Sequence, residues 1–319
     1  MISHVCQHET TKKHGRDKLG QQRYKCLACG ATFIKPKAKI LGDSRLPVDR
    51  AVQCLKMLLE GMSIRATARL TNTDKNAIIG LVTTLGPRCQ RFLKSRIKGI
   101  EVQEVECDET WGFIGMKEKT RQRLKHGHEF GDCYTYIAME RNTKLVLTWS
   151  LGKRGSEECW EFIDDLRFAT SGRFQLSTDG YTPYQSAVPL IFQFDVDFSQ
   201  VIKRFGGSSD MEAGRRYSPA NIVSVSVTHG CGNPDLDRAC TSHSERLNLS
   251  IRMHNRRMTR LTNAHSKKWE NHEAMMALYF AWYNFCRKHS TLKTTPAVAQ
   301  GLTDHVWTIE ELLTEVATF

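Results

Sequence analysis

The spacing of apolar residues predicts helices first and strands later along the chain. Residues 49–61 repeat apolar positions every three to four residues, which indicates an amphipathic helix that ends at Gly61. Two further short helices are expected in 63–86, and Ser63 is suited to cap the first. Thr73 or Asp74 would cap the second, which spans about 74–84. From residue 101 the apolar period changes to two, as in β-strands.

The order of the later elements suggests a fold class. Three strands are expected in succession within 101–152, with a basic hairpin loop at 116–131 and a turn at Arg-Asn-Thr. A helix capped by Ser156, a strand ending near Asp179, a short helix, a further strand and two long helices follow, with 207–241 irregular. This order predicts an α/β protein with a ribonuclease-H-like mixed-sheet domain.

Breaks in composition divide the chain into modules. We expect a zinc-ribbon-like module at 1–40, a helix-turn-helix module at 48–99, a ribonuclease-H-like catalytic domain at 100–290 and a C-terminal tail at 291–319. The alternative for the second module is an ordinary three-helix bundle. The basic segments on both sides of it favour DNA binding.

A CxxCG motif near the N-terminus predicts a structural Zn²⁺ ion. Cys26 and Cys29 can meet one tetrahedral ion across a tight turn. Upstream, Cys6 is the single thiol, and His8 is our choice for the fourth ligand, with His4 and His14 as the competing candidates. The alternative is a metal-free hairpin. Eleven Cys, an odd number and mostly scattered, argue against a disulfide scaffold.

The positive net charge of the chain indicates what kind of partner it binds. Residues 1–50 contain eleven Lys and Arg against four Asp and Glu, a large share of the overall +12. Polyanions are the natural partner of such a surface, and nucleic acid is favoured over acidic lipid because no amphipathic anchor or lipidation signal is evident. No apolar run is long enough to span a membrane, so we expect a cytoplasmic, nucleoid-associated protein with no membrane partner.

Three carboxylates are the candidates for chemistry. Asp108 lies in the first strand, and Asp179 lies at the end of the fourth, beside Gly180. Glu245 is the only acid between Thr241 and Lys268, among seven Lys and Arg. Clustered carboxylates repel each other unless cations neutralise them, so two Mg²⁺ or Mn²⁺ ions suit such a site.

Several segments together resemble a known family. VECDETWGFIG, LSTDGYTPY and the stretch from GNPDLDRACTSHSERLNLS to HVWTIEEL are similar to transposases of bacterial insertion sequences of the insertion-sequence-one family. The resemblance covers about 50–319 and is most specific over 232–312. It implies that Asp108, Asp179 and Glu245 match a DDE triad on an integrase-type core. The chain departs from the family pattern in its long stretch between Asp179 and Glu245 and in Ser3, which stands about where a first Cys would fall.

The resemblance implies a DNA transposase. It would bind terminal inverted repeats and target DNA, cut and join strands, and act as a homo-oligomer on DNA. One alternative is a non-catalytic sequence-specific DNA-binding protein derived from a transposase. Another is a metal-dependent nuclease without strand transfer, although two upstream DNA-binding modules make that assignment less favourable.

Further residues are candidates for contacts with DNA or metal. The candidates for DNA are Lys75, Asn76, Arg88, Arg91, Lys203, Arg204, Arg246, Arg252, Arg256 and Arg257. His229, Cys231, Cys240 and His243 have the residue types of a second metal site, but their unusual spacing favours buried thiols and surface histidines. Trp111, three residues after Asp108, is the aromatic residue most worth testing for stacking.

Overall fold

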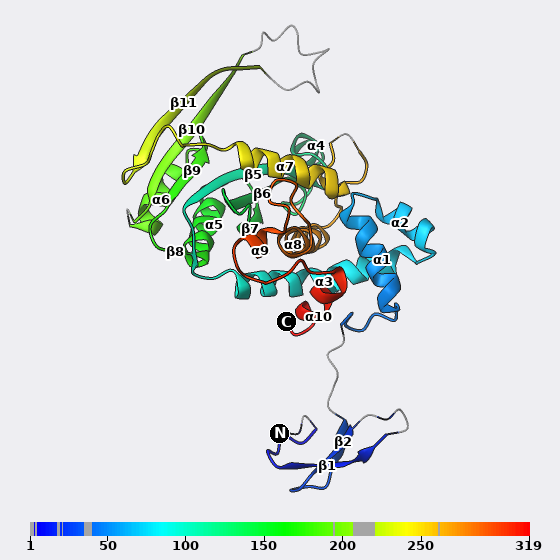
Figure 1. Cartoon of the computed structure of the whole chain (residues 1–319). Helices are drawn as coiled ribbons and strands as arrows, with labels where there is room; N and C mark the ends of the chain where they lie inside the picture. Colours follow the sequence, from blue (N-terminus) through cyan, green and yellow to red (C-terminus); the bar gives the residue numbers. More distant parts are fainter. Residues whose placement is uncertain are drawn as a thin grey trace. The chain divides into compact units, whose positions relative to one another are not determined.

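The computed structural model describes residues 3, 5–17, 20, 22–34, 40–193, 195–206, 221–260 and 262–319. The chain forms two compact units, Met1–Ile40 and Leu41–Phe319. We call them the N-terminal unit and the main unit and describe each by itself (Figure 1). No helix among the described residues is long and apolar enough to cross a membrane.

The N-terminal unit is built on a small antiparallel sheet. Its strands are β1 (Thr11–Arg16), β2 (Gln22–Cys26) and β3 (Thr32–Ile34), in the order β1-β2-β3. Gly30, with φ 73°, takes the left-handed conformation in the turn between β2 and β3, which glycine adopts without steric cost. Cys26 and Phe33 are the buried apolar side chains in the described part of this unit, so its core is small.

The main unit begins with three helices, α1 (Val48–Leu59), α2 (Ile64–Thr71) and α3 (Lys75–Arg96). The capping predictions hold: Ser63 Oγ accepts from the backbone N–H of Ala66, and Asp74 caps α3. The expected short third helix is wrong in length, because α3 has 22 residues and continues through Pro87. Tertiary packing explains the continuation: a Cβ on Gly86 would lie 2.3 Å from Ala274 Cα, so the two backbones pack closely there.

A six-stranded mixed sheet forms the centre of the main unit, in the order β11-β10-β9-β5-β6-β7. Strands β5, β6 and β7 are antiparallel neighbours, whereas β9 is parallel to both β5 and β10. Strand β11 pairs antiparallel with β10 at the sheet edge. The bounds are β5 (Glu104–Ile114), β6 (Gly131–Glu140), β7 (Val146–Gly152), β9 (Gln175–Asp179), β10 (Asp197–Gly206) and β11 (Asn221–Cys231).

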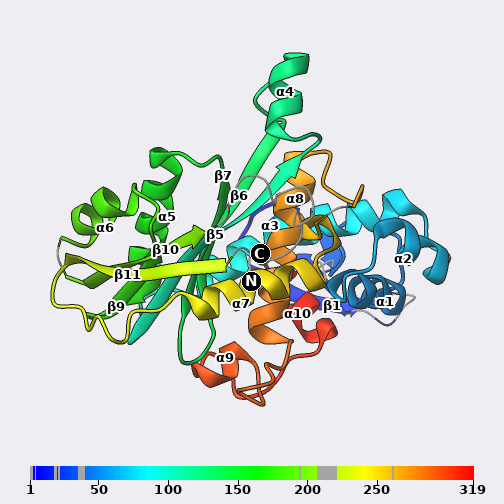
Figure 2. The ribbon, with the colours of Figure 1, turned by 90° about the horizontal axis from the view of Figure 1, so that it is seen from above.

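Helices cover both faces of this sheet (Figure 2). Helices α5 (Ser156–Ala169) and α6 (Tyr184–Phe192) pack on one face, where Phe162 contacts Tyr136 of β6. Helices α7 (Ser242–His254) and α8 (Trp269–Phe285) lie on the other, where Phe280 contacts Trp149 of β7. Helix α8 also packs against α3, and thirteen of its seventeen residues are buried. It is therefore the central helix of the main unit.

The remaining elements are short. The C-terminal segment folds back onto the helices: Trp307 and Phe319 pack against Phe92 of α3. These elements are a 3-10 turn, η2 (Arg256–Met258), two helices, α9 (Pro296–Ala299) and α10 (Ile309–Val316), and a two-stranded sheet of β4 (Ile100–Glu101) and β8 (Thr170–Ser171).

Three local expectations are wrong. Gly155, not Ser156, is the N-cap of α5, and it makes no side-chain cap bond. The stretch 207–241, expected to be irregular, contains β11, which pairs with β10. The alternation of Val and Ser along β11 is typical of a strand. Residues 207–220 of this stretch lie outside the described residues. The hairpin loop at 116–131 contains a helix, α4 (Glu118–Leu124), which carries no buried residue.

Candidate active site and metal centres

Asp108 and Asp179 lie at the same level of neighbouring parallel strands. The pairing of β5 with β9 runs from Glu104–Gln175 to Cys107–Thr178, one residue before the two aspartates. In-register residues of parallel neighbours project to the same face of a sheet, so both carboxylates project toward the face covered by α7. The structure therefore brings the first two predicted carboxylates together.

Helix α7 brings the third carboxylate, and a buried glutamate orients this helix. The carboxylate of Glu106 accepts hydrogen bonds from the backbone N–H groups of His243 and Ser244 at 2.9 and 3.0 Å. It thus satisfies donors at the N-terminus of α7, where the N-cap residue Thr241 makes no side-chain cap bond. One turn further, Asn248 Nδ2 donates to Asp108 Oδ2 at 2.7 Å. These contacts fix α7 to β5 and place Glu245 beside the sheet.

The three carboxylates line one cavity of about 470 Å³. Two cations, Lys203 and Arg154, lie in its wall. The full lining is Asp108, Arg154, Asp179, Gly180, Tyr181, Thr182, Val201, Ile202, Lys203, Phe205, Thr241 and Glu245. A Cβ on Gly180 would come within 3.2 Å of Ile202, so a larger residue there would crowd the cavity wall.

Each wall cation pairs with one candidate carboxylate. Lys203 Nζ contacts Glu245 Oε1, and Arg154 Nη2 lies 4.0 Å from Asp179 Oδ2. The Arg154 guanidinium also stacks on Tyr181, 4.5 Å from the ring centroid. Among the described residues, the three carboxylates are not one of the groups whose ligand atoms all lie within 4.8 Å of one another. The acids therefore surround the cavity with cations between them.

Burial and mutual repulsion perturb these acids. Burial, with a further contribution from Asp179, raises the pKa of Asp108 to about 7. Burial likewise raises the pKa of Asp179. Next to Asp108 is a fourth acid, Glu109, whose side chain is 2% exposed and accepts a 2.5 Å hydrogen bond from Tyr184 Oη. Burial raises the pKa of Glu109 to about 8. Such raised values mark acids whose charge needs a nearby cation.

The donor set of the cavity fits a hard divalent cation. Mg²⁺ and Mn²⁺ prefer carboxylate oxygen ligands and open sites that keep water or substrate positions. Asp108 and Asp179 come from strands, and the Glu245 side chain is 48% exposed and is held by Lys203 and by Thr241 Oγ1. The predicted two-ion site is thus chemically compatible with the residues present.

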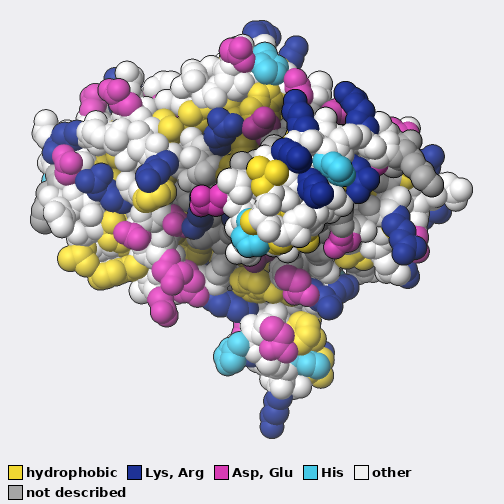
Figure 3. Space-filling view, turned by 90° about the horizontal axis from the view of Figure 1, so that it is seen from below, with side chains coloured by type: hydrophobic (Ala, Val, Ile, Leu, Met, Phe, Trp, Pro, Cys, Tyr) yellow, Lys and Arg dark blue, Asp and Glu magenta, His cyan; other side chains and the backbone are white. Residues whose placement is uncertain are grey.

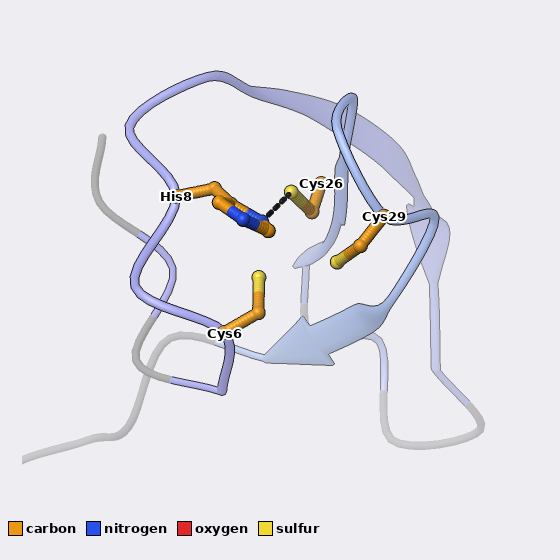
Figure 4. Close-up of side chains that lie close together, drawn as sticks. All are labelled: Cys6, His8, Cys26 and Cys29. Carbon is orange, nitrogen blue, oxygen red and sulfur yellow. Dashed lines mark hydrogen bonds between the residues drawn. The ribbon is translucent and has the colours of Figure 1, made fainter.

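The N-terminal unit brings together four sulfur and nitrogen ligands (Figure 4). The ligand atoms of Cys6, His8, Cys26 and Cys29 all lie within 4.8 Å of one another, and His8 Nδ1 is 3.5 Å from Cys26 Sγ. Ligands ~2.0–2.3 Å from a tetrahedral zinc ion are separated by ~3.5–3.8 Å, so the set can hold zinc. The competing His14 is exposed on β1, and His4 lies outside the described residues.

Ser3 supports this cluster at the position where a first Cys was expected. Its hydroxyl lies 3.1 Å from Cys6 Sγ, and this hydrogen bond is the main cause that lowers the pKa of Cys6 to about 6. A lower thiol pKa favours the thiolate, which is the form that binds metal. Ser3 therefore assists the neighbouring ligand.

The predicted DNA-contact residues divide by exposure. Lys75 and Asn76 are exposed at the start of α3, and Arg204, Arg246 and Arg256 are also exposed. Arg88 and Arg252 are half-buried, as is Lys203 in the cavity wall.

Arg91 and Arg257, like Lys203, make side-chain contacts within the protein. Arg91 is exposed, and its Nε and Nη2 donate to the backbone oxygen of Phe319 at 2.8 and 2.5 Å. Arg257 donates to Ser266 Oγ, and burial lowers its pKa to about 10.

The structure does not assemble the four residues weighed as a second metal site. Among the described residues, Cys240 and His243 instead approach Glu106, with His243 Nδ1 at 2.7 Å from its carboxylate. His229 is exposed and contacts the carbonyl of Gly232. Since Glu106 already serves the N-terminus of α7, we assign this group to the support of that helix.

Sequence reasoning missed Glu106, Glu109, Arg154 and Asn248. A signal for Glu106 was present, because the alternation along β5 places Glu104, Glu106 and Asp108 on one face of the strand. The contacts of the other three join segments up to 140 residues apart, and local pattern does not encode them.

Charge is mixed elsewhere on the surface. On the face shown in Figure 3, Lys and Arg side chains lie among Asp, Glu and apolar ones. An interface with a polyanion therefore depends on local groups of cations, and net charge alone does not locate it.

Comparisons with known proteins give a limited result. No family model matches the sequence, and no curated protein matches it. Among solved structures, the chain is similar to a piggyBac transposase in a synaptic complex with hairpin DNA, with a TM-score of 0.40 and 8% sequence identity. The similarity covers 89% of this chain and 73% of that chain.

Proposed function

We propose that this chain is a DNA transposase with a ribonuclease-H-like core. The observation that carries the proposal is the single cavity lined by Asp108, Asp179 and Glu245. The sheet order supports it: β5 lies between an antiparallel β6–β7 pair and the parallel strands β9 and β10. In this order the first and fourth strands of the core are neighbours, so acids on them face one site.

The three acids would act as metal ligands. Two Mg²⁺ or Mn²⁺ ions held by these acids would supply charge neutralisation for the attacking and leaving oxygens of a displacement at phosphorus. Asp108 and Asp179 fix the geometry from the sheet, while Glu245 completes the site from α7. Asn248 orients Asp108 through its 2.7 Å hydrogen bond. When the carboxylates take up cations, Lys203 would become available to hold a DNA phosphate at the cavity mouth, while Arg154 keeps its 3.4 Å contact with Glu109.

Sequence-specific binding would come from the N-terminal unit and from α1–α3. Helices α2 and α3 are joined by a short turn in which Asn72 has a left-handed conformation, φ 47°. This arrangement exposes Lys75 and Asn76 at the start of α3, the end of a recognition helix that contacts base edges. Exposed Arg204, Arg246 and Arg256 suit contacts with phosphates.

The reaction would proceed in two steps at the same site. Water attacks the phosphorus at the end of the element, the P–O3′ bond breaks, and the flank keeps the 5′-phosphate while the element keeps a 3′-hydroxyl. That hydroxyl then attacks a target phosphodiester and displaces a second 3′-hydroxyl, so no covalent enzyme intermediate forms. Two element ends have to be handled together, which calls for a homo-oligomer on DNA.

A cleavage and joining assay tests the proposal. Duplexes made from DNA on either side of the gene are incubated with Mg²⁺ and the wild type or the variants Asp108→Ala, Asp179→Ala and Glu245→Ala. We expect cutting and joining by the wild type and DNA binding without chemistry by all three variants. Binding by the wild type without cleavage in Mg²⁺ or Mn²⁺ would instead support a non-catalytic DNA-binding protein. Cutting without joining would support a nuclease.

A further inference from the structure

A basic helix lies at the tip of a two-stranded arm that leaves the sheet. Strand β5 continues six residues beyond Asp108 to Ile114, and β6 returns from Gly131. Helix α4 lies between them, away from the other helices (Figure 2). At ~3.3 Å per strand residue, the end of β5 is ~20 Å from Asp108. We call residues 114–131 the basic arm.

Of the two acidic side chains in the basic arm, Glu118 is engaged locally and Glu129 is exposed. Glu118 accepts a 2.9 Å hydrogen bond from Arg121 Nε and a second from Gln122. The Arg121 hydrogen bond is the main cause that lowers the pKa of Glu118 to about 2. The backbone N–H of Glu118 donates to Asp132 Oδ1 at 3.1 Å, which attaches the helix to β6. Glu118 is therefore committed to the fold of the arm.

Three cations of the arm have no such partner. Lys119, Arg123 and Lys125 are exposed, and none of them makes an ion pair in the part of the chain that the structure describes. Lys119 and Arg123 are four residues apart and share one side of the helix, and Lys125 follows as its C-cap residue.

This arrangement does not serve stability. Like charges four residues apart destabilise a helix by ~0.2–0.5 kcal/mol per pair, and a helix of this length is marginal without packing. Helix α4 buries no residue, and the hydrogen bond from the Glu118 N–H to Asp132 Oδ1 attaches it to β6. Clustered, exposed cations that make no ion pair within the described residues are suited to an anionic partner.

We propose that the basic arm binds the phosphate backbone of double-stranded DNA outside the catalytic cavity, through Lys119, Arg123 and Lys125. This inference rests on the proposed function for its choice of DNA. A duplex that enters the cavity and follows β5 would reach the arm after about six base pairs, at ~3.4 Å per step. The contact reads no bases, because lysine and arginine on phosphates carry register and affinity but not sequence.

The test is the salt dependence of duplex binding by the full-length protein. Fluorescence anisotropy compares the wild type with the triple variant Lys119→Gln, Arg123→Gln, Lys125→Gln, without Mg²⁺. A matched control, Arg167→Gln, Lys288→Gln, Lys293→Gln, removes the same charge from exposed sites outside the arm and outside the 48–99 module. Three lost phosphate contacts should reduce the slope of log K against log salt by about 2–3, since each contributes ~0.9. The control should keep the wild-type slope.

Equal slopes for the arm variant and the control would overturn the inference. If the triple variant fails to fold by circular dichroism, Arg123→Gln alone should reduce the slope by about 1. Arm-dependent binding of duplex RNA that is tighter than that of DNA would contradict the assignment to DNA. If the wild type cuts DNA and the arm variant has the same slope of log K against log salt, this inference is wrong but the transposase assignment stands. If the arm variant has a reduced slope but the wild type never cuts DNA, the transposase assignment is wrong but this inference stands.

Discussion

The two candidate metal centres of this chain are built in opposite ways. In the N-terminal unit, four sulfur and nitrogen ligands converge within 4.8 Å. In the main unit, three carboxylates line a cavity and are held apart, with Lys203 paired to Glu245 and Arg154 near Asp179. Thiols and imidazole can be neutral and tolerate close approach, whereas carboxylates repel each other.

The difference separates a site that maintains a fold from a site that performs chemistry. The N-terminal unit has Cys26 and Phe33 as its buried apolar residues within the described range, so a bound ion would contribute most of its stability. The main unit has a large core of its own, so its fold does not depend on a metal ion. Its cavity is open, so metal ions and substrate can enter it. Five experiments test whether the first site is structural and the second is chemical.

Loss of the zinc ligands should have the largest effect. Structural zinc contributes ~10–16 kcal/mol of apparent binding free energy, so Cys26→Ser should unfold the N-terminal unit. Hydrogen exchange should show loss of amide protection in β1–β3, while the thermal midpoint of the main unit is unchanged. Retained protection after removal of the metal would contradict a structural role for the ion.

Substitution in the cavity should abolish chemistry without unfolding the protein. Asp179→Asn removes one charge from the metal ligands with little change in shape, and cleavage should fall by at least ~10³-fold, or ~4 kcal/mol. The matched control is Asp195→Asn, an exposed aspartate outside the cavity. Rates from a gel assay with labelled duplex give the comparison. Equal loss in both variants would remove the distinction between the cavity and the surface.

The support of α7 should come next in size. Glu106→Gln takes away a buried charge that accepts from two backbone N–H groups, and urea unfolding should show a loss of about 1–3 kcal/mol. Cleavage should also fall, because α7 positions Glu245. The control Glu101→Gln, on an exposed residue, should change neither quantity. Full stability in the Glu106 variant would refute its role.

Asp108 should make the metal-free main unit less stable at high pH. Its pKa is raised to about 7 from 3.8, so between these values the folded state holds a proton that the unfolded state has released. Stability therefore falls as pH rises through this window. Asp108→Asn should gain about 1–3 kcal/mol at pH 8 and nothing at pH 3, measured by urea unfolding. An equal gain at both pH values would point to another cause.

Removal of a wall cation should have the smallest effect. Lys203→Met deletes the ammonium that competes with a metal ion for Glu245. Mn²⁺ affinity should rise about 5-fold, or ~1 kcal/mol, measured by titration calorimetry. Arg204→Met, on the next and exposed residue, is the control. Weaker binding in the Lys203 variant would mean that this ammonium helps to hold the site together.

Local chemistry made part of this architecture predictable. Ser63 and Asp74 cap their helices as expected, because capping depends on residues three or four positions apart. Asp108 and Asp179 were identifiable because strand order places them on neighbouring strands. The structure brings His8 together with three cysteines in a group that could hold a metal ion, although spacing alone left three histidines open.

The features that the sequence did not predict depend on contacts between residues far apart in the chain. Helix α3 extends through Pro87 because Gly86 packs against Ala274 of α8, a contact that the local pattern does not reveal. Glu106 stabilises a helix more than 130 residues later, and Arg154 reaches Asp179 from the β7–α5 loop. Burial of Arg257, expected to contact DNA, likewise depends on Ser266 and its surroundings. These features exist only once the sheet and its helices have packed.

Direct measurement of metal binding at the cavity tests the central claim. Mn²⁺ is titrated into the full-length protein with duplex DNA present, and free Mn²⁺ is followed by electron paramagnetic resonance for the wild type and the Asp108→Asn, Asp179→Asn double variant. We expect about two ions bound to the wild type and none to the double variant, while zinc stays bound to both. Equal Mn²⁺ binding by both proteins, or none by the wild type, would contradict the assignment of this cavity as a catalytic metal site.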